Sequence, residues 1–247
     1  MNSRDSHNLH YSHSVSDLQS PKKQRLQREK YQPKIDFMIS RFGGNWQSLA
    51  ILDIGVGYGF FLHMLEELGC TNLYGMDPFE ESINLSRRMT RADIRCGRIE
   101  DDAWPFTDHA FDLITCYDVV EHLSCPALFF RKAGRYLKKG GMVMLSTPNK
   151  QLPYVLRKLP LIGIRDTNPT HINVQPPGYW KDLAGTEGYS ILRTWKGEHL
   201  THLRMGLSLL QSFLKHTGID HRKVPVLNMF EQSFCMALVP DRKPPLS

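Results

Sequence analysis

The chain has 247 residues and a mass of 28.5 kDa, with 41% hydrophobic and 23% charged residues, so it can bury a sizeable core without disulfide bonds. No run of about 18 apolar residues is present, which excludes a membrane-spanning helix, and the polar first 20 residues contain no apolar stretch typical of a secretory signal. The five cysteines form no CxxC pair, which argues against a disulfide framework or a cysteine-rich zinc site and favours a reducing, cytoplasmic location.

The net charge of +6 is unevenly distributed along the chain. Basic residues are in excess in the first 30 residues and in the last hundred, whereas the middle of the chain is slightly acidic. A basic C-terminal part could meet an anionic substrate or nucleic acid, but an ordinary solvated surface explains it as well. Because no RGG, RRM or zinc-finger signature accompanies these charges, we do not expect a nucleic-acid partner.

The elements expected along the first 150 residues follow from composition and periodicity. The polar start of the chain, rich in Ser and His, predicts a flexible leader, which we set at residues 1–30. Apolar side chains at helical spacing predict a helix over 31–42 that ends at Gly43-Gly44. Short apolar runs and amphipathic stretches then alternate. They predict strands at 49–54, 72–76, 93–97, 111–117 and 142–147, and helices at 58–68, 79–89 and 126–137. This order is typical of an α/β fold with a doubly wound, Rossmann-like, mostly parallel sheet and helices on both faces.

Beyond Pro148 the alternation loosens. Residues 148–177 contain several prolines and little periodicity, so we expect a long irregular segment there. A helix at 177–187, a strand at 189–195, a helix at 200–216 and a last strand at 230–240 follow. The prediction is therefore a seven-stranded sheet in one domain over residues 31–247, with two insertions, at about 148–177 and 197–229, that form a lid over the substrate.

The strongest functional signal is LDIGVGYG at residues 52–59, where a strand runs into Gly-x-Gly-x-Gly and then into a helix. Glycines let the backbone turn sharply and approach a ligand, and the start of a helix offers free N–H groups. Asp77 ends the next strand, 22 residues after Gly55. This is close to the spacing of about 20 residues expected for a carboxylate that accepts hydrogen bonds from ribose hydroxyls. The three features together predict a nucleotide-derived cofactor.

The motif departs from the patterns of the common nucleotides. The third glycine comes one position too early for a dinucleotide site, where Phe60 stands instead, and no Walker lysine is present. Asp53 lies just before the first glycine, where its carboxylate would repel a pyrophosphate but attract an amino group and a sulfonium. The sequence therefore indicates S-adenosyl-L-methionine (SAM).

These motifs resemble those of class I SAM-dependent methyltransferases of the small-molecule group. LDIGVGYG is similar to the first motif of the family, GMDP at 75–78 to the second, and residues 98–123 to the third and fourth. The resemblance covers residues 45–150 and, loosely, the final strands, and it implies that the last strand is antiparallel. It also implies that the cofactor-binding residues are Asp53, Gly55, Gly57 and Gly59 around the methionine part, Asp77 at the ribose, Ile99 and Glu100 beside the adenine, and Tyr117 and Asp118 beside the sulfonium. By the same resemblance Lys34 would reach the cofactor carboxylate, and a solvated helix lysine is the alternative.

Asp118-Val-Val-Glu121-His122 follows the fourth predicted strand. The three polar residues share one face if the segment is helical. The segment resembles the E-x-x-E-H element of ubiquinone-pathway O-methyltransferases and of small-RNA 2′-O-methyltransferases, with Asp in place of the first Glu. Two carboxylates and an imidazole could hold Mg²⁺. A role in the site without metal, which would make His122 catalytic, and simple helix capping are the alternatives, and we expect no metal.

His171, in the irregular segment after the fifth strand, is the other candidate catalytic residue, because an imidazole that titrates near neutral pH can act as a general base. A structural histidine is the alternative. We expect an enzyme that moves a methyl group from SAM to a small-molecule acceptor, at a hydroxyl oxygen. The alternatives are a methyltransferase acting on RNA or protein and a non-catalytic SAM-binding module. CYDVVEH stands where an NPPY or DPPY tetrapeptide would follow the fourth strand, which disfavours amino-group methylation by that motif.

Overall fold

The computed structural model describes residues 20–149, 169–196, 216–217 and 233–241. Within these ranges seven strands form one sheet in the order β3-β2-β1-β4-β5-β7-β6. The strands are β1 (Ile51–Ile54), β2 (Leu73–Asp77), β3 (Asp93–Cys96), β4 (Phe111–Tyr117), β5 (Leu137–Pro148), β6 (Tyr189–Lys196) and β7 (Ser233–Pro240). Strands β1 to β5 pair in parallel, whereas β7 is antiparallel to both β5 and β6. The predicted fold class, including the antiparallel last strand, is confirmed.

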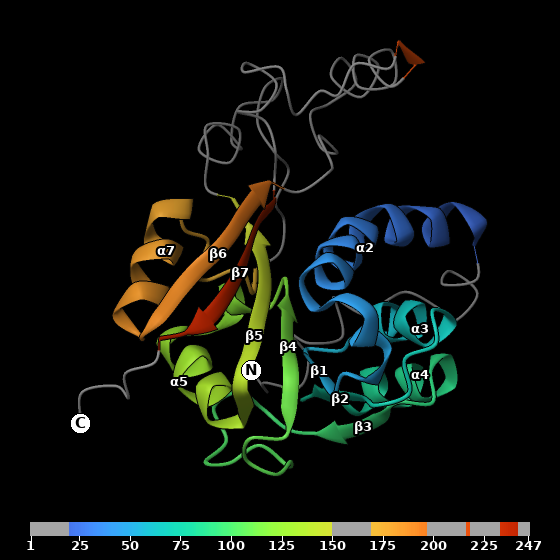
Figure 1. Ribbon diagram of the computed structural model, residues 1–247, viewed down its shortest axis with the longest axis horizontal. Helices are drawn as coiled ribbons and strands as arrows, with labels where there is room; N and C mark the ends of the chain where they lie inside the picture. The colour runs from blue at the N-terminus through green and yellow to red at the C-terminus, as the bar shows by residue number, and fades with distance from the viewer. Residues whose placement is uncertain (1–19, 150–168, 197–215, 218–232, 242–247) are drawn as a thin grey trace.

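Helices cover both faces of this sheet (Figure 1). Their bounds are α2 (Pro21–Phe42), α3 (Phe60–Glu67), α4 (Glu80–Met89), α5 (Ala127–Tyr136) and α7 (Pro177–Thr186), with short 3-10 helices η1 (Gly43–Ser48) and η2 (Val120–His122). Successive residues of a strand face opposite sides of the sheet: Leu113 belongs to the core cluster that includes residues of α2, α3 and α4, and Ile114 to the one that includes residues of α5 and α7. The central strands β1, β4 and the second half of β5 are therefore near-continuous runs of buried residues, as the sequence predicted.

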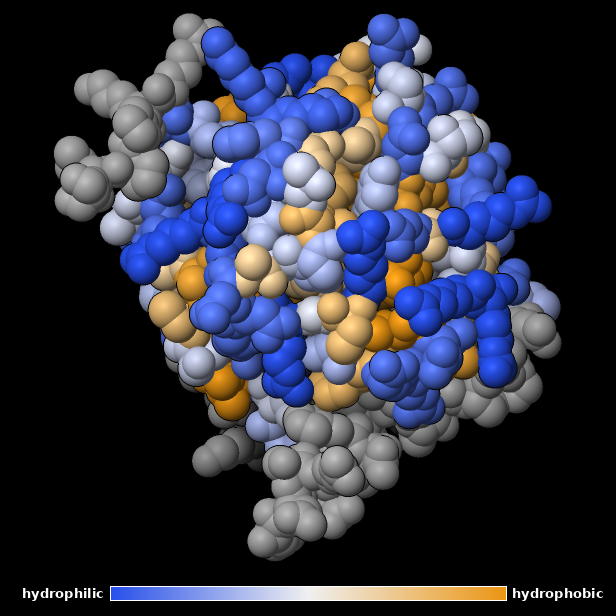
Figure 2. Space-filling view, turned by 90° about the horizontal axis from the view of Figure 1, so that it is seen from below, coloured by the Kyte–Doolittle hydropathy of each residue, from blue (hydrophilic) through white to orange (hydrophobic). Residues whose placement is uncertain are grey.

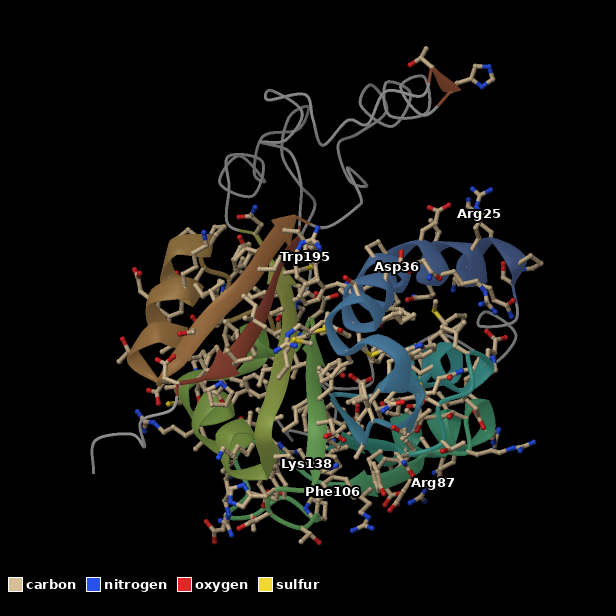
Figure 3. All side chains as sticks on the ribbon, viewed as in Figure 1. Arg25, Asp36, Arg87, Phe106, Lys138 and Trp195 are labelled. Carbon is tan, nitrogen blue, oxygen red and sulfur yellow. The ribbon has the colours of Figure 1, made fainter. Side chains whose placement is uncertain are left out.

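The face of the molecule seen in Figure 2 is mostly hydrophilic. Figure 2 shows charged and polar residues over one face, with apolar residues appearing between them. Figure 3 shows Phe106 and Lys138 at one end of the sheet and Trp195 near the other. At the former end, Lys138 pairs with Asp112 across β4 and β5 at 2.7 Å. None of the helices in the described ranges is both long and apolar enough to cross a membrane.

The start of α2 differs from the prediction. The helix begins at Pro21, so a flexible leader is wrong for residues 21–30, and residues 1–19 lie outside the described residues. Proline is favoured in the first turn of a helix, and the following Lys, Gln, Arg and Leu residues are good helix formers. Arg28 also ties this part of α2 to Glu67 of α3 at 2.8 Å. These ten residues include Lys30, whose ammonium lies 2.7 Å from the carboxylate of Asp118.

In the second half of the chain, one element differs from the prediction and others cannot be compared with it. β5 starts at Leu137, five residues before the predicted strand, because Leu137 already pairs with Phe111; the register then shifts, and regular pairing resumes between Leu113 and Met142. Most of the predicted lid, at 148–177 and 197–229, and nearly all of the predicted helix at 200–216 lie outside the described residues. The lid therefore remains a prediction.

Candidate active site

The glycine turn sits at the carboxyl end of β1, between β1 and β4. The chain leaves β1 toward β2 and leaves β4 toward β5, so this is the point at which the strand order reverses and where open α/β sheets bind ligands. Gly55, Gly57 and Gly59 all have positive φ, at 74°, 52° and 76°. A Cβ on Gly55 would collide with Cγ2 of Val119. Other residues would strain this turn, which explains the glycine spacing in the sequence.

Asp77 closes the turn from the neighbouring strand. One of its carboxylate oxygens accepts a hydrogen bond from the backbone N–H of Gly57 at 3.0 Å, and the other accepts one from the N–H of Phe79 at 3.0 Å. Asp77 is only 2% exposed, and burial raises its pKa although these two N–H groups oppose the shift. A carboxylate has about four acceptor positions, so acceptor capacity remains for a ligand hydroxyl besides these two N–H groups and the nearby hydroxyl of Ser82. The arrangement fits a ribose diol, the role predicted for Asp77.

A cleft of about 440 Å³ opens beside this turn. Its volume lies within the range of about 300–1,000 Å³ typical of small-molecule sites. The structure brings together here most of the residues predicted to bind the cofactor, together with His122 and Thr170. The predicted residues that line the cleft are Gly55, Asp77, Ile99, Glu100, Tyr117 and Asp118.

Asp53 is not among the residues that line the cleft. It is 4% exposed and pairs across the sheet with Thr115, whose hydroxyl donates to its carboxylate at 2.6 Å. Burial, and to a smaller extent the charge of Asp77, raise the pKa of Asp53 to about 7 against the hydrogen bond from Thr115. The structure therefore makes Asp53 a buried support beneath the turn. Gly57 and Gly59 likewise shape the turn without lining the cleft.

Lys30 was missed by the sequence reasoning. Its ammonium lies 2.7 Å from Oδ2 of Asp118, and Ser146 Oγ donates to Oδ1 of the same carboxylate at 3.0 Å. Asp118 has a left-handed backbone, with φ at 57°, which turns its side chain toward α2. Burial alone would raise the pKa of Asp118, but the charges of Lys30 and Lys34 and the two hydrogen bonds outweigh it and lower the pKa to about 2. Asp118 is thus an anion, and its cationic partner comes from a helix that is distant in the sequence.

Lys34 lies one turn further along α2. It is 5% exposed, donates to the backbone oxygen of Lys30 at 2.9 Å, and sits 5.1 Å from the centroid of the Tyr117 ring. The alternative of a solvated surface lysine is therefore wrong. Tyr31 packs against Phe61 and Tyr117, with ring centroids 5.4 and 5.7 Å apart, so an aromatic cluster anchors α2 over the ends of β1 and β4.

Glu121, His122 and His171 form a second cluster, beside the cleft. One ligand atom from each lies within 4.8 Å of the others. Glu121 is fully buried and, among the described residues, neither of its carboxylate oxygens has a hydrogen-bond partner. Burial and, to a smaller extent, the charge of Asp118 raise the pKa of Glu121 well above its usual range, although its own backbone N–H and the nearby hydroxyl of Thr147 oppose the shift. The rings of His122 and His171 lie 4.9 Å apart, and Nδ1 of His122 is 3.0 Å from the backbone oxygen of Thr170.

This cluster differs from the trio suggested by the sequence. The segment after β4 forms a single 3-10 turn instead of an α-helix, so Asp118 does not share a face with Glu121 and His122. His171, which lies 50 residues after Glu121 in the sequence, is the third member of the cluster instead of Asp118. A buried carboxylate without a partner, next to two imidazoles, has the donor set expected for a divalent cation.

Comparison with known proteins agrees with this geometry. Residues 23–194 match the model of a family described as "Methyltransferase domain". The chain is 32% identical over 108 residues to the ubiquinone biosynthesis O-methyltransferase of Neisseria meningitidis serogroup A, a match that covers 40% of this chain and 44% of that protein. It is 31% identical over 180 residues to the enzyme of the same name from Mesorhizobium japonicum, covering 64% of this chain and 70% of that protein.

The similarity to several of these curated relatives spans only about half of their length. Among solved structures, a SAM-dependent methyltransferase from Archaeoglobus fulgidus superimposes with a TM-score of 0.61 at 17% identity, covering 87% of this chain and 93% of that chain. At this level of identity the likeness bears on the fold alone.

Proposed function

Since the chain belongs to the methyltransferase domain family and has the fold of the class I SAM-dependent enzymes, we propose that it transfers the methyl group of SAM to a hydroxyl oxygen of a small-molecule acceptor. The observation that carries the proposal is the adjacency of two sites at the carboxyl ends of β1 and β4. One is a glycine-and-aspartate cleft suited to a nucleoside, and the other is the cluster of Glu121, His122 and His171. The O-methyltransferase names of the relatives support oxygen as the acceptor atom.

The cofactor part of the proposal assigns roles within the cleft. Asp77 would hold the ribose, and Ile99 and Glu100 would flank the adenine. The turn at Gly55, with Tyr117, would surround the methionine part. SAM supplies an electrophilic methyl group when bound, so the protein has to align the acceptor and exclude water.

The acceptor hydroxyl also has to lose its proton. We expected no metal from the sequence, but the unpartnered carboxylate of Glu121 supports one, held by Glu121, His122 and His171. A divalent cation there would lower the pKa of a hydroxyl bound to it. If no cation binds, His171 is the candidate general base, as its position next to His122 allows. Both chemistries require His171.

A chelator separates these two mechanisms. Under the metal proposal, EDTA abolishes turnover, Mg²⁺, Mn²⁺ or Zn²⁺ restores it, and binding of S-adenosyl-L-homocysteine (SAH), the demethylated product, stays unchanged. Turnover that survives exhaustive chelation would remove the metal and leave His171 as the base.

The function itself is tested by following labelled methyl from SAM into fractionated small-molecule, RNA and protein pools. The proposal predicts label in the small-molecule fraction. Label in RNA or protein would favour the alternative class of substrate that the basic C-terminal part suggests, and retention on heparin with a steep salt dependence would support it. SAH binding without transfer to any pool would indicate a non-catalytic SAM-binding module. A cytoplasmic location, which the cysteine pattern favours, is part of the same proposal; all five cysteines lie among the described residues and form no disulfide bond there.

A further inference from the structure

The open end of the cleft carries a pair of opposite charges whose purpose the proposed function does not explain. Asp118 lines the cleft, and Lys30 reaches it from α2, at 2.7 Å. The side chains are 31% and 32% exposed, so the pair lies where the cleft meets solvent. Asp118 directly follows Tyr117 at the end of β4, beside the turn at Gly55.

Both partners are held in place before any ligand arrives. The backbone N–H of Asp118 donates to the oxygen of Ser146 at 2.8 Å, and Ser146 Oγ donates to its carboxylate. On the other side, Lys34 donates to the backbone oxygen of Lys30, and Tyr31 anchors the same turn of α2 against Tyr117. Such a fixed pair presents a dipole to the cleft instead of a single negative charge.

The distinction matters for a cofactor that changes charge during its reaction. SAM carries a positive sulfonium, which becomes a neutral thioether in SAH, and the positive charge is already partly dispersed in the transition state. An uncompensated carboxylate beside the sulfonium would stabilise SAM more than the transition state, which raises the affinity for the reactant but slows its conversion. A carboxylate neutralised by an ammonium avoids this.

We propose that Lys30 is a positioning residue of the cofactor site, which fixes Asp118 and offsets its charge so that SAM is not held more tightly than its transition state. The proposal rests on the proposed use of SAM, and it concerns the relative affinity for SAM and SAH. If Lys30 had only a structural role, its replacement would weaken the binding of SAM and of SAH by the same factor.

The test compares dissociation constants of SAM and SAH by calorimetry. Lys30→Met should shift the ratio of the two constants in favour of SAM, by about tenfold for one unit charge near a partly exposed site. In turnover, kcat and KM for SAM should fall together, the signature of a more stable bound reactant. Lys30→Arg keeps the charge and should restore the ratio. Asp118→Asn should shift it in the opposite direction, and the double variant Lys30→Met/Asp118→Asn should return near the wild-type ratio.

Arg25→Met is the matched control. Arg25 lies on the same helix with its side chain 75% exposed, toward the end of α2 that is remote from the sheet (Figure 3). Arg25→Met should leave the ratio of the SAM and SAH dissociation constants unchanged. A Lys30→Met ratio within twofold of wild type, with SAH still bound, would overturn the proposal. If Lys30→Met binds neither ligand, an unshifted ratio in Asp118→Asn overturns it instead. Failure of the wild-type protein to bind SAM or SAH would count against the proposed function and is distinguishable from both results.

Discussion

Replacing Asp77 by alanine removes a carboxylate that serves the fold and the cofactor at the same time. In the structure, its two oxygens accept the backbone N–H groups of Gly57 and Phe79, each at 3.0 Å. Hydrogen bonds to charged groups contribute about 1.5–3 kcal/mol each, so the loss of two predicts a destabilisation of about 3–6 kcal/mol, reduced where water replaces the carboxylate. For a chain of this size, each kcal/mol lowers Tm by roughly 2–4 °C.

Cofactor binding should lose a comparable amount of free energy in this variant. Two ribose hydroxyls donating to the same carboxylate would forfeit at least about 3 kcal/mol, which corresponds to a fall of about 10²-fold or more in affinity for SAH. Calorimetry of SAH binding, at a temperature where melting curves show the variant folded, measures this loss. Asp77→Asn keeps one acceptor oxygen, so its affinity for SAH should lie between those of the wild type and Asp77→Ala. Affinity within twofold of wild type in folded Asp77→Ala would refute the placement of the ribose.

The remaining predictions concern the turn, a buried carboxyl and the cluster. Gly55→Ala should lower the free energy of unfolding by about 1–2 kcal/mol because of the left-handed backbone, and by a further amount because the new Cβ collides with Val119. It should also weaken SAH binding, because the turn moves. Chemical denaturation measures the stability and calorimetry the SAH affinity, and unchanged values would contradict the structure. Asp53 has a folded-state pKa of about 7, above its unfolded value of about 3.9, so the native state binds more protons and stability should fall as pH rises from about 4 to 7. Asp53→Asn should flatten this part of the pH–stability curve, and a curve that keeps its slope would show that another group is responsible. His171→Ala should lower turnover by about 10²–10⁴-fold while SAH affinity stays within a few-fold, and normal turnover would remove His171 from the mechanism.

Much of the fold was predictable because its signals are local. The apolar run before Gly55 and the glycine spacing after it identify β1, the turn and α3 from a dozen residues. Asp77 could be found because a single crossover fixes the distance between consecutive parallel strands. The antiparallel last strand came only from resemblance to a family, since no residue pattern states strand direction.

The pairings at the site were not predictable, because they join residues that are far apart in the sequence. Lys30 joins Asp118 only because α2 lies across the ends of β1 and β4, and no motif links two residues so far apart in sequence. The charged stretch around Lys30 was therefore assigned to a flexible leader. Asp118 was expected to face His122, and the left-handed backbone that turns it away is rare outside glycine. His171 could be proposed for its chemistry, but its place beside His122 depends on how the segment after β5 folds back.

The identity of the atom that receives the methyl group tests the account most directly. The protein would be incubated with SAM labelled with ¹³C at its methyl group and with the small-molecule fraction that accepts label, and the product would be examined by NMR. We predict a labelled carbon bonded to oxygen, formed by the wild-type protein and strongly reduced in Asp77→Ala when SAM is kept below the concentration that saturates this variant. A labelled carbon bonded to nitrogen or carbon, or label confined to RNA or protein, would contradict it.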